Sequence, residues 1–101
     1  MLLYNVTVKI EKDTESEWLE WMRTVHIPDV LNTQQFTGSR MSKLLDQPDD
    51  DDPTYVIQYE CESMEQFNHY ISIFAPALRD EFNTRYKDRF VAFRTLMEVV
   101  G

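Results

Sequence analysis

The feature that most constrains the fold is a set of four apolar segments whose side chains alternate between two sides. They cover residues 2–10, 36–46, 54–62 and 89–100. A period of two residues is typical of β-strands, because successive side chains point to opposite faces of a sheet. In the last segment both sides are mainly apolar. This strand therefore needs cover on both of its faces.

Two segments with helical spacing separate these strands. Residues 14–17, Thr-Glu-Ser-Glu, and residues 63–66, Ser-Met-Glu-Gln, have the form of capping boxes, in which side chains satisfy backbone donors at a helix start. Apolar residues then recur three and four positions apart, which is typical of a helix packed on a core. Pro28 predicts a break that leaves His26 at a corner, and Pro76 predicts a kink or restart in the second helix.

The order strand, helix, strand, strand, helix, strand predicts a single α+β domain over residues 1–101 with ferredoxin-like βαββαβ topology. Its four antiparallel strands carry both helices on one face. The other face would leave a large apolar patch in water, which monomers rarely tolerate. We therefore expect a homodimer that pairs through this sheet face, as in a dimeric α+β barrel.

The charge balance excludes some partners. Ten Lys and Arg against eighteen Asp and Glu give a net charge of -8, and the basic residues are dispersed. Nucleic acids and anionic membrane surfaces recruit clustered Lys and Arg, so we expect neither as a partner. No apolar run approaches the length of a membrane span, and the first residues do not resemble a signal peptide. These features predict a cytoplasmic protein.

No motif predicts a metal or a cofactor. The single cysteine, Cys61, is expected to be a buried apolar residue, since it has no partner for a disulfide or a metal cluster. The run of four aspartates at 49–52 lacks the alternation and the glycine of a calcium loop, so it predicts a solvated hairpin loop. Glycine-rich phosphate loops are absent as well.

Five residues are candidates for a ligand-binding site. His26 can titrate or coordinate near neutral pH, although a histidine at a helix corner commonly serves only as a cap. Trp21 could wall a pocket for a flat ligand or simply fill the core. Polar residues within strands must be paired or hydrated, so they could form a network at the dimer seam or line a cavity. The strand residues considered for this role are Asn5, Gln58 and Arg94.

Five stretches of the chain together resemble a known bacterial family. They read Tyr-Asn-Val-Thr-Val at 4–8, Trp-Leu-Glu-Trp-Met at 18–22, His-Ile-Pro-Asp-Val-Leu at 26–31, Phe-Ala-Pro-Ala-Leu-Arg at 74–79 and Arg-Phe-Val-Ala-Phe-Arg-Thr-Leu at 89–96. The family is the uncharacterised domain of unknown function 4286. It is similar in architecture to the dimeric α+β barrel superfamily, which includes antibiotic-biosynthesis monooxygenases and haem-degrading enzymes. The chain departs from the family pattern in having no glycine shortly before Phe36.

Two functions follow as hypotheses. The first is a homodimeric domain that binds a small molecule or a protein partner. The alternative is a cofactor-poor oxygenase or isomerase, with His26 as general base or ligand and with Asn5 or Arg94 orienting an anionic oxygen. The enzyme hypothesis predicts a pocket of at least ~300 Å³ that His26 and two further polar groups reach, whereas the other hypothesis predicts a filled core.

Overall fold

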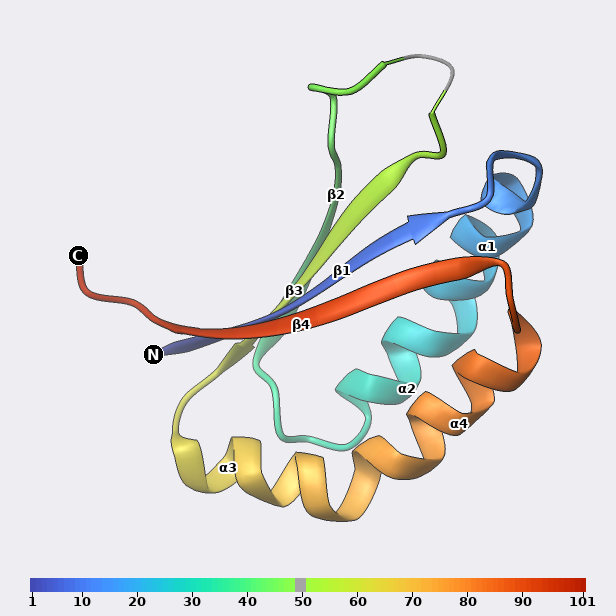
Figure 1. Cartoon of the computed structure of the whole chain (residues 1–101). Helices are drawn as coiled ribbons and strands as arrows, with labels where there is room; N and C mark the ends of the chain where they lie inside the picture. Colours follow the sequence, from blue (N-terminus) through green and yellow to red (C-terminus); the bar gives the residue numbers. More distant parts are fainter. Residues whose placement is uncertain (49–50) are drawn as a thin grey trace.

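The computed structural model describes residues 1–48 and 51–101, which form one sheet with helices packed against one of its faces (Figure 1). The strands follow the order β2-β3-β1-β4 and every neighbouring pair is antiparallel. The predicted ferredoxin-like topology is therefore confirmed. The strands are β1 (Leu2–Ile10), β2 (Gly38–Lys43), β3 (Thr54–Cys61) and β4 (Phe90–Glu98).

The helical segments connect the strands in two similar crossovers. The first contains a 3₁₀ turn η1 (Lys12–Thr14), α1 (Glu15–Trp21), a π-helical turn η2 (Met22–His26) and α2 (Ile27–Leu31). The second contains α3 (Met64–His69), a π-helical turn η3 (Tyr70–Phe74) and α4 (Ala75–Arg85).

The second strand, Gly38–Lys43, is shorter than the predicted span of residues 36–46. Phe36 lies before the strand and is buried in the core. The Phe36 ring packs edge-on against Tyr70, with centroids 4.7 Å apart, and lies 6.1 Å from the ring of Tyr4. Gln34, two residues earlier, has a φ of 66°, a left-handed conformation that usually favours glycine. The turn that delivers Phe36 to the core thus forms without the glycine.

The two predicted helix starts differ in their caps. The hydroxyl of Ser63 accepts a hydrogen bond from the backbone N–H of Gln66, so the second cap is confirmed. The prediction of a capping box at Thr14 is wrong. Thr14 already has helical backbone angles after η1, so its side chain makes no cap, and its hydroxyl instead accepts from Arg89 at 3.5 Å.

The predicted break at Pro28 is also wrong, and His26 does not lie at a corner. The chain stays helical because η2 widens by one residue: the N–H of Ile27 donates to the carbonyl of Met22, five positions earlier. Pro28 then falls in the first turn of α2, where its missing N–H costs no hydrogen bond. Pro76 follows η3 in the same way at the start of α4.

The two faces of the sheet differ in cover. Val8, Ile10 and Ile57 point toward the helices and are fully buried. On the open face, Val91 is 71% exposed and Phe93 is 61% exposed. No helix in the described part of the chain is both long and apolar enough to cross a membrane.

Cys61 is buried on the covered face, as expected, with its sulfur 3.3 Å from the carbonyl oxygen of Ser63. Within residues 1–48 and 51–101, no group of three or more His, Cys, Asp or Glu side chains could hold a metal. The loop prediction for the aspartate run at 49–52 falls in part on Asp49 and Asp50, which lie outside the described residues.

Candidate functional site

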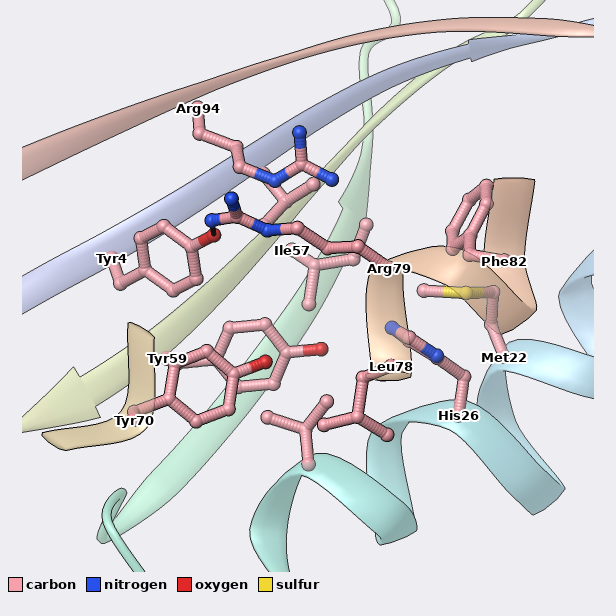
Figure 2. Close-up of a pocket in the computed structure, with 12 residues that line it drawn as sticks. Tyr4, Met22, His26, Ile57, Tyr59, Tyr70, Leu78, Arg79, Phe82 and Arg94 are labelled. Atoms are coloured by element: carbon pink, nitrogen blue, oxygen red, sulfur yellow. Dashed lines mark hydrogen bonds between the residues drawn. The ribbon is translucent and has the colours of Figure 1, made fainter. Parts of the chain in front are cut away.

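A small cavity lies between the covered face of the sheet and the helices, and side chains from three strands and both helical crossovers converge on it (Figure 2). Its volume is about 20 Å³. A space of this size holds one water-sized group. The apolar part of the wall includes Met22, Val30, Ile57, Leu78 and Phe82. The polar part consists of Tyr4, His26, Tyr59, Tyr70, Arg79 and Arg94.

The π-turns determine which helix residues reach this cavity. A π-turn brings residues five positions apart onto one side of the helix. Trp21 and His26 are accordingly stacked, with ring centroids 5.0 Å apart and an interplanar angle of 26°. Trp21 also packs edge-on against Phe82 and Tyr86. The indole therefore supports the imidazole from behind and does not line the cavity itself.

His26 is a neutral base at physiological pH. Burial lowers the pKa of its imidazole to about 4, and Arg94 lowers it further, while Asp29 opposes the shift. Its Nδ1 atom is buried and has no hydrogen-bond partner among the described residues. Buried polar atoms are paired in the large majority of cases. The unpaired nitrogen is therefore a group at which a ligand could be bound.

Two guanidinium groups reach the cavity from opposite directions. Arg79 extends from α4 and donates a hydrogen bond to the hydroxyl of Tyr4 at 2.9 Å. Arg94 extends from β4, and Figure 2 shows its guanidinium close to that of Arg79. None of the ion pairs formed by the described residues includes either arginine. Among the residues that the structure describes, no carboxylate lines the cavity, so the charge of this wall is positive.

Tyrosine hydroxyls add neutral donors to the same wall. Burial raises the pKa of Tyr70 to about 12, and the nearby Arg79 and Arg94 only partly offset this. Burial also raises the pKa of Tyr59 well above its usual value. Both phenols thus keep their protons at neutral pH. The cavity presents several hydrogen-bond donors and one basic nitrogen, a set suited to an anionic oxygen.

Of the five residues that the sequence suggested, the structure brings two to the cavity, His26 and Arg94. Trp21 lies one layer behind. Asn5 and Gln58 face each other across β1 and β3 on the open face of the sheet. The Asn5 amide donates to the sulfur of Met97 at 3.6 Å. These two residues therefore belong to a different surface from His26.

Sequence reasoning missed Arg79 and the tyrosines Tyr4 and Tyr59. A signal for Arg79 was present, since it occupies the apolar stripe of α4 together with Ala75 and Phe82 at spacings of four and three. A charged residue in such a stripe needs a polar destination. The tyrosines gave no such signal, because tyrosine is common in cores.

A second titratable cluster lies at the other end of the sheet, and its members are paired with one another. Tyr55 donates to the carboxylate of Glu15, whose oxygen is also 3.2 Å from the ammonium of Lys43. The hydrogen bond from Tyr55 is the main cause that lowers the pKa of Glu15. These contacts tie α1 to β2 and β3, so the cluster has a structural role.

Comparison with known proteins shows the family to which this sequence belongs. Residues 1–100 match the family described as a domain of unknown function, DUF4286. No curated protein matches the chain.

Solved structures with the same fold cover nearly the whole chain at low sequence identity. HapK from Hahella chejuensis is 9% identical over 100% of this chain and 94% of its own, with a TM-score of 0.73. An MhuD mutant with two manganese protoporphyrin IX molecules per active site is 20% identical over 99% and 95% of the two chains, with a TM-score of 0.66. A dimeric ferredoxin-like protein from an uncultured marine organism is 17% identical over 97% and 96%, with a TM-score of 0.61. At these identities the likeness establishes the ferredoxin-like α+β fold.

Proposed function

The chain belongs to the DUF4286 family, and we propose that it is a cytoplasmic homodimeric domain that binds a small organic anion in the cavity between its sheet and its helices. One observation carries the proposal: Arg79 and Arg94 converge on a half-enclosed site, and none of the described residues in its wall is a carboxylate. In a chain with a net charge of -8, two guanidiniums placed together without a carboxylate partner are suited to an external anion.

The walls favour an organic anion over an inorganic one. Val30, Ile57 and Phe82 supply apolar surface opposite the guanidiniums. Ligand sites commonly combine apolar walls with a few polar groups that orient the ligand. A carboxylate or enolate oxygen would accept hydrogen bonds from the arginines, and the attached carbon skeleton would contact the apolar side.

The second candidate is the cofactor-poor isomerase or oxygenase with His26 in the site. It is favoured by the buried, unpartnered Nδ1 of a neutral imidazole beside the same cavity. Such a nitrogen could take a proton from carbon next to the carbonyl of a bound ligand. The product would be an imidazolium and an enolate, with the enolate charge stabilised by the guanidiniums. Return of the proton to the enolate oxygen would give the enol and complete a keto–enol isomerisation.

The manganese protoporphyrin bound by the MhuD mutant is not a ligand that we propose for this chain. The half-enclosed cavity of about 20 Å³ has no room for a macrocycle. The volume is also below the ~300 Å³ that the enzyme hypothesis requires of a substrate pocket. Neither candidate ligand fits the cavity at its present size, so both functions need the cavity wall to open when a ligand enters.

Homodimerisation is proposed through the open face of the sheet. Support comes from three exposed apolar side chains on the edge strand β4, at Val91, Phe93 and Met97. A patch of this kind on a sheet face is typical of an interaction surface. A protein of similar fold is described as dimeric.

The test of anion binding is a titration of the protein with short carboxylates, followed by NMR chemical shifts. We expect Arg79→Met and Arg94→Met each to weaken binding about 10-fold or more, because a hydrogen bond to a charged group contributes about 1.5–3 kcal/mol. Arg23→Met is the matched control, since Arg23 lies on the helix surface and pairs with Glu20. Equal affinity of all three variants and the wild type would refute the proposal.

The enzyme candidate has a separate test in D₂O. A bound keto acid should exchange its α-hydrogen for deuterium in the presence of the wild type, and His26→Gln should abolish the exchange while retaining binding. Absence of exchange with the wild-type protein would eliminate His26 as a base.

A further inference from the structure

A second hollow lies on the outer surface of the helical layer, between α2 and the segment formed by η3 and α4. Its volume is about 370 Å³, and it is wide open to solvent. Most of its wall is apolar, including Ile73, Phe74 and Ala77. We refer to this hollow as the outer groove. Ile73 is 61% exposed in it.

Leu78 belongs to both the outer groove and the inner cavity. It is half-buried, and Figure 2 shows its side chain beside the imidazole of His26. Leu78 therefore forms a wall that the two hollows share. A change of rotamer at this one residue is a small motion compared with a rearrangement of the backbone.

We propose that the cavity and the outer groove are two halves of one binding site, joined when Leu78 moves aside, and that the site takes an amphipathic carboxylate with its acid group at the arginines and its hydrocarbon tail in the groove. This inference rests on the proposed binding of an anion in the cavity and assigns the chemical class of that anion.

The distribution of charge sets the orientation of such a ligand. Among the residues that line the outer groove there is no cation, and Asp29 is the one charged group. An anionic head is therefore repelled at the groove and attracted to Arg79 and Arg94 inside. The apolar side chains of the groove suit an uncharged tail.

The size of the cavity favours the connection. About 20 Å³ holds a single water-sized group, so every carbon beyond the acid group must lie elsewhere. The outer groove is the hollow that shares a wall with the cavity, at Leu78.

The backbone around Leu78 is built with an irregular turn. The N–H of Ala75 donates to the carbonyl of Tyr70, five residues earlier, which closes the π-turn η3. A π-turn contains one residue more than an α-turn, so conversion to α-geometry would rotate the residues that adjoin it. Leu78 lies one turn beyond this point, in α4.

The experiment uses a series of straight-chain carboxylates, acetate, butanoate, hexanoate and octanoate, titrated into the whole protein by NMR. With the wild type, affinity is expected to rise about fourfold for each methylene that enters the groove. Ile73→Asp places a charge in the groove and should remove most of this increase, while acetate binding stays unchanged. Leu45→Asp is the control, because Leu45 is exposed and lies outside the groove.

Ala77→Trp provides a second variant, which fills the outer groove and does not line the inner cavity. It should bind acetate as the wild type does and lose the gain for octanoate. Equal affinity of the wild type for acetate and octanoate would overturn the amphipathic site, and so would an Ile73→Asp variant that follows the wild type along the whole series. Failure of the underlying anion site has a different signature: acetate would not bind, or Arg79→Met would bind it as well as the wild type does.

Discussion

The covered face and the open face of the sheet are built from the same alternating strands, but each carries side chains of an unexpected kind. The covered face has charged residues beside it, and the open face has exposed apolar residues. The covered face packs on the helices, and its cavity is lined by Arg79, which is half-buried, and by Arg94, which is exposed on its edge strand. The open face is exposed and carries Val91 and Phe93. Charged side chains that line a cavity beside the core indicate a ligand, and apolar groups on an exposed sheet face indicate a protein partner. The two anomalies therefore point to two separate interactions.

The largest effect is expected on the open face from Phe93→Lys. In a homodimer this substitution buries an unpaired ammonium in an apolar seam, which costs about 3 kcal/mol or more for each protomer. Light scattering at micromolar concentration should give twice the chain mass of 12.1 kDa for the wild type and the single mass for the variant.

Val25→Lys is the control for this substitution, because Val25 is partly exposed on η2 and does not belong to the sheet. It should leave the dimer intact. A wild-type protein that scatters as a monomer would show that the open face has no second copy on it.

On the covered face, Ile57→Ala should lower the free energy of unfolding by about 2–5 kcal/mol, because Ile57 is fully buried and its loss leaves a cavity in the core. Ile73→Ala, at an exposed helix position, should change it by less than about 0.5 kcal/mol. Urea denaturation measures both. Equal costs for the two substitutions would contradict the assignment of the covered face as the core.

The pH dependence of stability reports the buried imidazole of the covered face. The pKa of His26 is lowered from 6.5 to about 4 in the folded protein. The unfolded chain therefore takes up a proton first as the pH falls. The stability due to the neutral imidazole is fully present above pH 6.5 and is lost between pH 6.5 and 4.

Between pH 7 and pH 5 this loss amounts to about 2 kcal/mol of unfolding free energy. His26→Gln should remove that part of the pH dependence, and urea denaturation at the two pH values measures it. An unchanged pH dependence in His26→Gln would mean that the imidazole is not held neutral by burial.

The smallest effect is expected at the turn that delivers Phe36 to the covered face. Gln34 adopts a left-handed conformation with φ of 66°, which costs a non-glycine residue about 1 kcal/mol. Gln34→Gly should therefore raise the free energy of unfolding by about 1 kcal/mol. Gln35→Gly is the matched control, and it should bring no gain, because Gln35 has no positive φ. A lower free energy of unfolding in Gln34→Gly would contradict the claim that the left-handed conformation of Gln34 is strained.

The fold could be predicted from the sequence because the fold depends on the alternation of side chains. All four strands, from β1 at Leu2–Ile10 to β4 at Phe90–Glu98, keep this alternation. The prediction failed where backbone geometry could not be inferred from residue type. Thr14 and Pro28 both carry the usual signals for a cap and a break, but an extra 3₁₀ turn and a π-turn changed the register of each.

The site was harder to predict for a different reason. Alternation places Asn5 and Gln58 on one side of their strands and Tyr4 and Tyr59 on the other. Because both sides carry apolar residues, the pattern does not say which side the helices cover. Arg79 comes from a helix, and only the packed structure brings it to Arg94 from the last strand.

The most direct test of the central claim is a crystal structure of the protein soaked with a straight-chain carboxylate that bears bromine at its far end. The account predicts anomalous density for bromine in the outer groove near Ile73 and a carboxylate between Arg79 and Arg94, with Leu78 in a new rotamer. Bromine bound elsewhere, with the two arginines free of ligand, would contradict it.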